Sequence, residues 1–171
     1  MIRVTSGLVK NKILKAPEIE GFRAVQEKAK LALFSILGDK IVGVTCLDLF
    51  SGSGNLGIEA LSRGAAWCDF DDSNKVCKET IDENVNNCGF LEMSEVSGKD
   101  AVKFVTKTQK IYDIIFLDPF YDTTSHIFLM KSMENILAKN FLRHVFKPFI
   151  FTMQHICPFA RSSLCLAIGD K

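Results

Sequence analysis

Two short stretches of this sequence bring acidic residues together with a backbone that can approach a ligand. The first is "DLFSGSGNLG" (48–57), whose glycines at 52, 54 and 57 have the spacing G-x-G-x-x-G. Glycines between a strand and a helix allow a sharp turn, and the helix then points its first amide groups at whatever lies there. The spacing alone fits a dinucleotide, another nucleoside cofactor, or a turn that only packs.

The acid at position 48 favours one of these ligands. A carboxylate beside a pyrophosphate would be electrostatically unfavourable. S-adenosylmethionine has no phosphate, and it carries a cationic amino group and a cationic sulfonium. We therefore expect S-adenosylmethionine rather than NAD, although Asp48 could instead cap local backbone groups. The residues expected around this cofactor are Asp48, Phe50, Gly52, Ser53, Gly54 and Asn55.

Further acids follow the next two predicted strands. In "DFDD" (69–72), alternation places the side chains of 70 and 72 on one face and those of 69 and 71 on the other. A carboxylate there can accept both ribose hydroxyls of a nucleoside, and we expect this of Asp72, with Asp71 as the alternative. Asp100 would accept from the adenine amino group or form a helix N-cap.

The second stretch is "FLDPFYD" (116–122). Methylation of an exocyclic amine requires acceptors for its N–H groups, so that the lone pair is available in line with the methyl group. Asp118 with a backbone carbonyl fixed by the proline would supply them, and Tyr121 or Phe120 would stack on a base turned out of its helix. A β-turn with proline in its second position is the alternative interpretation.

Both stretches have to be positioned by a sheet. Short apolar runs alternate with amphipathic segments, which predicts right-handed βαβ units and a Rossmann-like, doubly wound, mostly parallel α/β sheet. In such a sheet the ligand lies beyond the carboxyl ends of the strands, where both stretches fall. The predicted strands are 43–50, 65–71, "SEVSG", 112–120, 148–156 and 162–169, and the predicted helices are 23–37, the segment after the glycine loop, "KVCKETIDENVNNCG", "AVKFVTK" and 124–138.

Charge and composition narrow the class of protein. The 171 residues carry a net charge of +1, but residues 1–30 hold seven Lys or Arg against three Glu, which favours an anionic partner on one face. No apolar run is long enough to span a membrane, and no signal core is present, so we expect a cytoplasmic protein. Six scattered cysteines lack metal-ligand spacing, and we expect neither a metal nor disulfides.

These stretches together resemble the RsmD family, bacterial 16S ribosomal RNA guanine-N2 methyltransferases of the class I S-adenosylmethionine-dependent type. The likeness is carried by "RVTSGLVKNKILKAP", "GFRAVQEKAKLALFSIL", "CLDLFSGSGNLGIEALSRGA" and "DIIFLDPFY", the last corresponding to a D-P-P-F/Y motif. The resemblance implies donor contacts at Asp48, Gly52 and Gly54, with Asp72 at the ribose and Asp100 near adenine. It also implies that Asp118, Pro119, Phe120 and Tyr121 meet the target base.

The same resemblance implies a partner and an organisation. The partner would be 16S ribosomal RNA in an assembling small subunit, bound by a monomer. A basic arm or hairpin (1–22) would precede the methyltransferase domain (23–171). The basic residues expected to contact RNA are Arg3, Lys10, Lys12, Lys15 and Arg23.

Departures from the family pattern define the alternatives. Phe120 replaces the second proline of the D-P-P-F/Y motif, "R-A-V" (23–25) replaces "R-P-T", and Gln154 stands where an acid is usual. The sequence stops at "GDK", where the family continues into a last strand. These differences fit a weakened or inactive RNA- or ribosome-binding relative, and D-P-x-F/Y motifs also serve DNA adenine or protein amide methylation.

Overall fold

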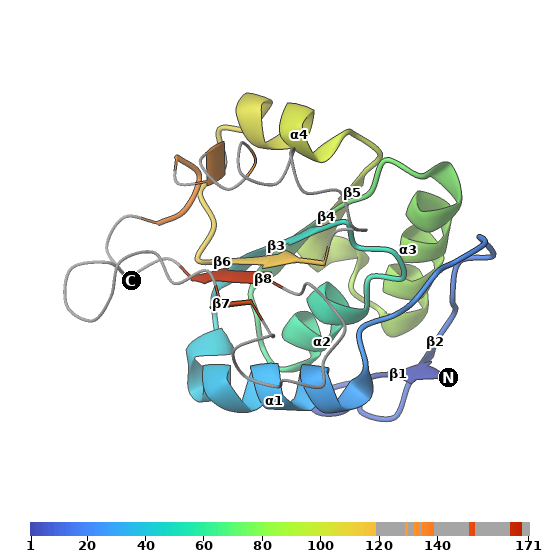
Figure 1. Cartoon of the computed structure of the whole chain (residues 1–171). Helices are drawn as coiled ribbons and strands as arrows, with labels where there is room; N and C mark the ends of the chain where they lie inside the picture. The colour runs from blue at the N-terminus through green and yellow to red at the C-terminus, as the bar shows by residue number, and fades with distance from the viewer. Residues whose placement is uncertain (119–128, 130–131, 134, 139–150, 153–164, 169–171) are drawn as a thin grey trace.

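A central sheet carries the fold. The computed structural model describes residues 1–118, 129, 132–133, 135–138, 151–152 and 165–168. The sheet order is β5-β4-β3-β6-β8-β7, and the four strands β5, β4, β3 and β6 run parallel (Figure 1). The antiparallel strand β8 lies between β6 and β7. The strands are β3 (Thr45–Leu49), β4 (Trp67–Asp71), β5 (Ser94–Ser97), β6 (Ile114–Leu117), β7 (Phe151–Thr152) and β8 (Cys165–Ile168).

The strand order reverses between β3 and β6. From β3 the chain moves outward through β4 to β5, and it then returns to place β6 on the other side of β3. In a doubly wound sheet, this reversal opens a crevice at the carboxyl ends of the two strands. The glycine loop follows β3, and Asp118 follows β6, so the loop and this acid of the second motif lie at the crevice.

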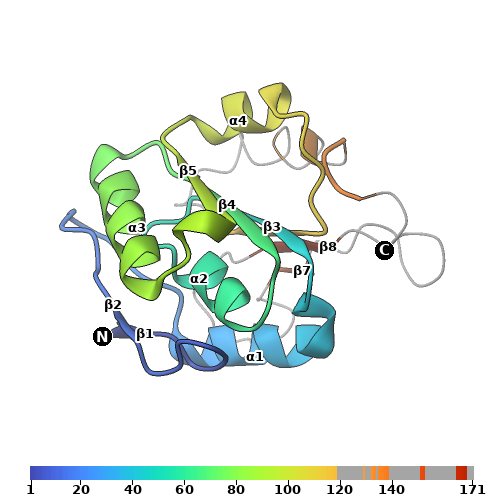
Figure 2. The same ribbon diagram turned by 180° about the vertical axis from the view of Figure 1, so that it is seen from behind.

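Helices cover both faces of the sheet. In Figure 1, α4 (Ala101–Lys107) lies above the sheet and α1 (Glu27–Leu37) lies below it. Figure 2 shows from behind that α2 (Asn55–Ser62) lies between α1 and α3 (Lys75–Cys88). Two 3-10 turns, Gly38–Ile41 and Leu91–Met93, follow α1 and α3. The described core accordingly forms two apolar clusters, one on each face of the sheet.

The N-terminal segment forms a small hairpin outside this sheet. Strand β1 (Ile2–Arg3) pairs antiparallel with β2 (Ile13–Leu14). Val4 and Leu14 are buried in the same apolar cluster as α1 and α2. The segment therefore packs on the domain rather than projecting from it.

The first helix differs from the sequence prediction in its start and in part of its buried face, which the apolar spacing assigns to Val25, Ala29, Ala32, Leu33, Ile36 and Leu37. It begins at Glu27 rather than at residue 23, because Gln26 is still extended, with φ −60° and ψ 139°. Its buried face includes Phe34, whose ring lies 5.8 Å from that of Phe116, whereas Ile36 is 51% exposed. Ala29, Leu33 and Leu37 are buried as predicted, and Phe34, which packs on Phe116 of β6, is buried in place of Ile36.

The predicted helix over 124–138 is wrong at its end. Leu137 forms a parallel bridge with Tyr112, and the Ala138 amide donates to the Tyr112 carbonyl. The Leu137 amide still donates to the Met133 carbonyl, and from Ala138 the amide donates to the chain before β6 instead. Of the rest of this segment, Leu129, Ser132 and Met133 are helical, and the other positions up to residue 134 lie outside the described residues.

The remaining described elements agree with the predicted ones. Strands β3 to β8 fall within their predicted segments, and α3 ends at Gly89, which has the left-handed φ of 76°. Cys46, Cys68, Cys77 and Cys88 are buried and unbridged. Among the described residues, the helices are too short or too polar to cross a bilayer.

Candidate active site

The glycine loop connects β3 to α2 through residues with left-handed backbone. Phe50, Gly52 and Gly54 have φ values of 57°, 56° and 74°. Gly54 is the N-cap of α2, and its amide donates to the Ser51 carbonyl over 2.7 Å. Glycine adopts these angles without strain, while Phe50 pays a steric cost that is common in functional loops.

The third glycine of the motif, Gly57, is required for close packing rather than for its backbone angles. A Cβ on Gly57 would lie 2.3 Å from the ring of Phe70 and 2.7 Å from Cys68 Sγ. Helix α2 therefore lies directly on β4, and no side chain fits between them. The third glycine is a packing requirement, which holds the start of α2 close to the crevice.

Asp48 lies buried beneath the loop, with 2% of its surface exposed. Its Oδ2 accepts a hydrogen bond of 2.9 Å from the Gly57 amide, one of the free amides in the first turn of α2. Burial raises the pKa of Asp48 well above its usual range, the Gly57 bond lowers it, and Asp118 and Asp72 raise it further. Asp48 thus caps local backbone, as the sequence allowed, and the charged groups that act on it, Asp72 and Asp118, are acidic.

Asp72 also touches the glycine loop. Its Oδ2 accepts from the Gly52 amide over 2.9 Å, and its Oδ1 accepts from the Asn74 amide over 2.9 Å. The side chain is half-buried at the carboxyl end of β4. The structure therefore brings Asp72 together with the loop and leaves part of its carboxylate surface accessible.

Asp71 points to the opposite face of the sheet. It is 1% exposed, and its Oδ1 accepts from the Lys99 amide over 3.0 Å. Burial raises its pKa to about 6. Among the described residues, Asp71 Oδ2 and Ser97 Oγ are buried and have no hydrogen-bond partner. The Ser97 side chain nevertheless lowers the pKa of Asp71, so the two groups interact at the ends of β4 and β5.

Asp100 serves as the N-cap of α4. Its side chain accepts from the Lys103 amide over 3.1 Å. The residue is exposed, so its second oxygen is available to a ligand. Both roles considered for Asp100 are compatible with this geometry.

Asp118 follows β6 directly. Leu117 pairs with Leu49 in the sheet, so Asp118 lies level with Phe50 at the start of the glycine loop. The side chain is half-buried, and burial raises its pKa to about 6. The predicted partners Pro119, Phe120 and Tyr121 lie outside the described residues.

The glycine loop is also held by polar side chains of its own and by the ring of Phe22. Ser51 Oγ accepts from the Asp71 amide over 3.1 Å and donates to the Asp48 carbonyl, which ties β3 to β4. Ser53 and Asn55 are buried. A Cβ on Gly52 would lie 2.8 Å from the ring of Phe22, so that ring rests on the loop.

The basic residues of the N-terminal segment do not form one continuous cationic face. Arg3 pairs with Glu27 over 2.8 Å, and Lys15 pairs with Glu83 over 2.8 Å. Lys10, Lys12 and Arg23 are exposed, and no ion pair is found for them within the described part of the chain. Those three carry the available positive charge of the five predicted RNA contacts.

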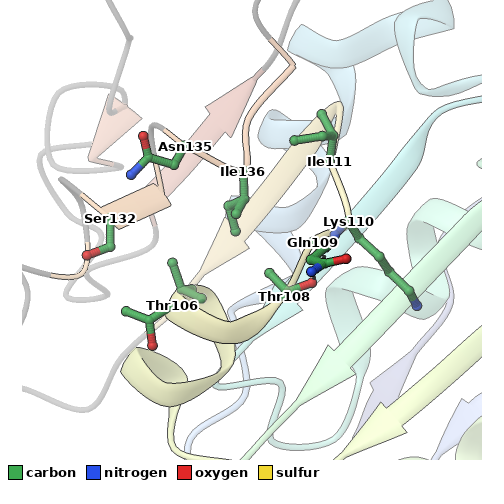
Figure 3. A pocket seen from close by; sticks show the side chains of 9 residues that line it. Thr106, Thr108, Gln109, Lys110, Ile111, Ser132, Asn135 and Ile136 are labelled. Atoms are coloured by element: carbon green, nitrogen blue, oxygen red, sulfur yellow. Dashed lines mark hydrogen bonds between the residues drawn. The ribbon is translucent and has the colours of Figure 1, made fainter.

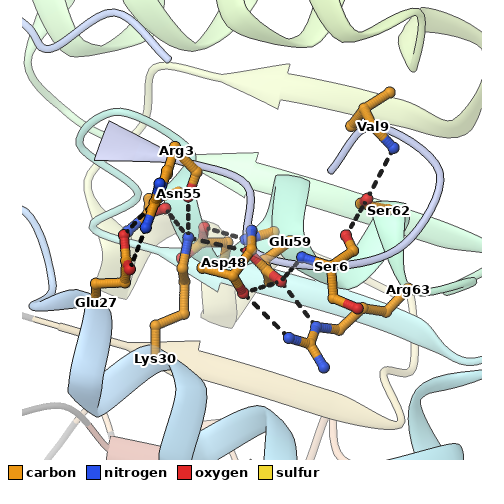
Figure 4. A network of polar contacts seen from close by, with 12 residues as sticks. Arg3, Ser6, Val9, Glu27, Lys30, Asp48, Asn55, Glu59, Ser62 and Arg63 are labelled. Atoms are coloured by element: carbon orange, nitrogen blue, oxygen red, sulfur yellow. Dashed lines mark hydrogen bonds and ion pairs between the residues drawn. The ribbon is translucent and has the colours of Figure 1, made fainter. Parts of the chain in front are cut away.

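A buried polar network fixes the N-terminal segment to α1 and α2 (Figure 4). Glu59 is 0% exposed and accepts from the Thr5 amide over 2.8 Å and from Arg63 Nε over 2.8 Å. Lys30 Nζ lies 2.9 Å from Glu59 and donates to Asn55 Oδ1 over 2.7 Å. Sequence reasoning missed Lys30 and Glu59; charged residues within otherwise apolar helical segments were the available signal.

A separate hollow lies at the opposite end of the sheet, beside the segment that precedes β6 (Figure 3). It is bordered by Thr106, Thr108, Lys110, Ser132 and Asn135. The ammonium group of Lys110 is held by Asp69 over 2.8 Å and by Glu95 over 2.9 Å. This hollow shares none of the residues of the two motifs.

Comparison with known proteins places this geometry in a family. The family model described as "Conserved hypothetical protein 95" matches residues 2–151. The chain is 37% identical to "Putative rRNA methyltransferase YlbH" of Bacillus subtilis, over 70% of this chain and 67% of that protein. It is 34% identical to "Ribosomal RNA small subunit methyltransferase D" of Buchnera aphidicola, over 80% of this chain and 69% of that protein.

A solved structure shares the fold over nearly the whole length. The structure named "Putative methyltransferase yhhF from Escherichia coli" superposes with a TM-score of 0.77 and 22% identity. The alignment covers 99% of each chain. At this identity the likeness concerns the fold, which is the Rossmann-like fold of class I methyltransferases.

Proposed function

We propose that this chain, which belongs to the Conserved hypothetical protein 95 or RsmD family, is a methyltransferase acting on 16S ribosomal RNA. It would transfer a methyl group from S-adenosylmethionine to the N2 amine of a guanine. The observation that carries the proposal is the acidic crevice at the reversal of the sheet. There the glycine loop, Asp72 and Asp118 meet at the carboxyl ends of β3, β4 and β6.

The charges of the crevice support S-adenosylmethionine over a dinucleotide. The charged groups that shift the pKa of Asp48 are Asp118 and Asp72, and both are acidic. Such a field attracts a cationic ligand and repels a pyrophosphate. When bound, S-adenosylmethionine supplies an electrophilic methyl group on a positively charged sulfur.

The chain's own residues would then bind and orient the reactants. Asp72 would accept the ribose hydroxyls, with its carboxylate fixed by the Gly52 amide. Asp118 would accept an N–H of the guanine amine and direct the nitrogen lone pair toward the methyl carbon. The amine would release a proton when it is methylated, and the Asp118 carboxylate would accept that proton.

RNA is the proposed substrate class because of the exposed cations of the N-terminal segment. Lys10 and Lys12 lie around the hairpin turn, and Arg23 adjoins Phe22 at the glycine loop. Such cations neutralise phosphates, and the binding they support weakens as the salt concentration rises. Two relatives are named "Ribosomal RNA small subunit methyltransferase D", which supports RNA of the small subunit as the substrate. We propose in addition that a monomer acts on this RNA while the subunit assembles.

Calorimetric titration tests the cofactor assignment. S-adenosylhomocysteine should bind the purified chain, whereas NAD should not. Asp72→Ala should weaken the binding of S-adenosylhomocysteine about tenfold or more, which corresponds to the loss of hydrogen bonds worth ~1.4 kcal/mol or more. The matched control is Asp82→Ala, because that acid lies on the surface of α3 and pairs with Lys78. Binding of NAD in preference to S-adenosylhomocysteine would overturn the assignment.

A further inference from the structure

One buried amide side chain joins the N-terminal segment to the glycine loop. Asn84 of α3 is 2% exposed. Its Oδ1 accepts from the Lys15 amide over 2.8 Å, and its Nδ2 donates to the Lys15 carbonyl over 2.9 Å. The same Nδ2 donates to the carbonyl of Ser53, the residue between the first two glycines, over 2.9 Å. The oxygen and both N–H groups of this side chain are thereby used on backbone groups.

A second side chain makes a parallel connection on the other side of Gly54. Lys30 Nζ donates to the Arg3 carbonyl over 2.7 Å and to Asn55 Oδ1 over 2.7 Å. Arg3 lies in the first strand of the hairpin, and Lys15 directly follows the second. Both ends of the hairpin are therefore tied to the residues that flank Gly54 (Figure 4 shows the Lys30 side).

The chain between Lys15 and Lys30 also contacts the glycine loop. The ring of Phe22 occupies the space beside Gly52, where a Cβ would lie only 2.8 Å from it. Arg23, one of the three exposed cations without an ion pair in the described part, is the next residue. The segment that would meet RNA and the loop that would meet the cofactor are thus in direct contact.

We propose that Asn84 is a positioning residue that couples the binding of S-adenosylmethionine in the glycine loop to the ordering of the N-terminal segment. The inference rests on the function proposed above. A ligand in the loop fixes the Ser53 peptide, and Asn84 passes that restraint to the backbone of Lys15. The hairpin with its exposed Lys10 and Lys12 is then held in place for RNA. The coupling is reciprocal, so that RNA held by this segment raises the affinity for the cofactor.

Helix α3 offers a matched pair of variants for the test. Asn84→Ala removes the connection. Asn87→Ala changes the same residue type on the same helix, and Asn87 is exposed. The probe is S-adenosylhomocysteine, and its dissociation constant is measured by calorimetry for each variant. Coupling is measured from the rate of trypsin cleavage after Lys15. The measure is a ratio: the cleavage rate without the probe divided by the cleavage rate at a saturating concentration of the probe.

In the unaltered chain and in Asn87→Ala, the probe should slow cleavage at least about fivefold, the lower end of typical coupling between two sites. In Asn84→Ala the ratio should fall to about one, even though the uncomplexed variant is cleaved faster. A purely structural role for Asn84 would raise both rates and leave their ratio unchanged, and that result would overturn the proposal.

Two further outcomes are decisive. If the probe binds the unaltered chain without slowing cleavage, the coupling does not exist, while the proposed function stands. If the probe does not bind, both fall. Should Asn84→Ala not fold, as judged by circular dichroism, Asn84→Asp replaces it. Asp keeps an acceptor for the Lys15 amide but offers no donor to Ser53, so an unchanged ratio in that variant also refutes the coupling.

Discussion

The carboxylate of Asp48 and the amide of Gly57 are joined across the glycine loop by a hydrogen bond of 2.9 Å. Asp48 lies in β3 and Gly57 in the first turn of α2, so the bond fixes the start of the helix against the end of the strand. The acid and the third glycine of the motif therefore form one arrangement, in which the acid is held buried close to the crevice.

Replacement of Asp48 by asparagine should separate stability from ligand binding. An amide oxygen can keep the Gly57 bond, while the cost of burying a charge disappears. We expect the free protein to gain on the order of 1 kcal/mol at neutral pH, which corresponds to a rise in Tm of about 2–4 °C. The affinity for S-adenosylhomocysteine should fall, because the amino group of this ligand loses its attraction to the acidic side chain at position 48.

The pH dependence of this effect has a definite sign. Burial holds the folded-state pKa of Asp48 well above its usual value. The contribution of the protonated Asp48 carboxyl to folding stability is fully present below the unfolded-state pKa near 4. This contribution is lost as the pH rises through the folded-state pKa. The gain from Asp48→Asn should thus be small near pH 4 and larger near pH 7, as measured by thermal denaturation at both values. Asp113→Asn is the control, because Asp113 accepts from the Thr45 amide at the opposite end of β3. A gain that is equal at the two pH values would contradict this explanation.

Gly57→Ala should destabilise the fold. The added Cβ would lie 2.3 Å from Phe70 and must push α2 away from β4. Overpacking of this kind costs about 1–3 kcal/mol, measurable by urea denaturation. Gly98→Ala is the matched control, because its Cβ would meet only the flexible side chain of Lys78 at 3.1 Å. Equal stability of the two variants would show that α2 can move away without loss.

Glu59→Ala should be among the most destabilising single changes in the described structure. It removes the acceptor for Thr5, Lys30 and Arg63 and leaves the ammonium group of Lys30 buried. Loss of one partner of a buried pair costs roughly 3–5 kcal/mol. Glu79→Ala provides the comparison, because its pair with Lys75 is exposed and should contribute less than about 1 kcal/mol. A small effect of Glu59→Ala in chemical denaturation would mean that the N-terminal segment is not held by this network.

The rate of methyl transfer should depend on the ionisation of Asp118. Burial raises its pKa to about 6, so the group is protonated below that pH and cannot accept from the guanine amine. The rate constant kcat/KM should rise with pH through about 6 and level off above pH 7. Asp118→Asn should lower the rate and remove this step. A profile without an inflection near pH 6 would argue against an ionised Asp118 in the reaction.

Local patterns were sufficient for some features and insufficient for others. The glycine loop and β3 to β6 were predictable, because glycine spacing and apolar runs are properties of adjacent residues. The buried face of α1 was predictable only in part: Leu33 and Leu37 follow from the apolar spacing, whereas the contact of Phe34 with Phe116 joins residues far apart in the chain. The pairing of Lys15 with Glu83 depends equally on tertiary contact, and so the sequence overestimated the free positive charge of the N-terminal segment. Asn84 belongs to no recognisable sequence motif, and its contact with Ser53 forms only in the folded chain.

The proposed reaction is tested most directly by mass spectrometry of nucleosides from unmodified 16S ribosomal RNA after incubation with the purified chain and isotopically labelled S-adenosylmethionine. We predict labelled N2-methylguanosine with the unaltered chain, and a rate reduced about a hundredfold or more in Asp118→Ala, in line with the loss of an orienting acceptor. Labelled adenosine, or no labelled nucleoside from a chain that binds S-adenosylhomocysteine, would contradict the proposed guanine methylation.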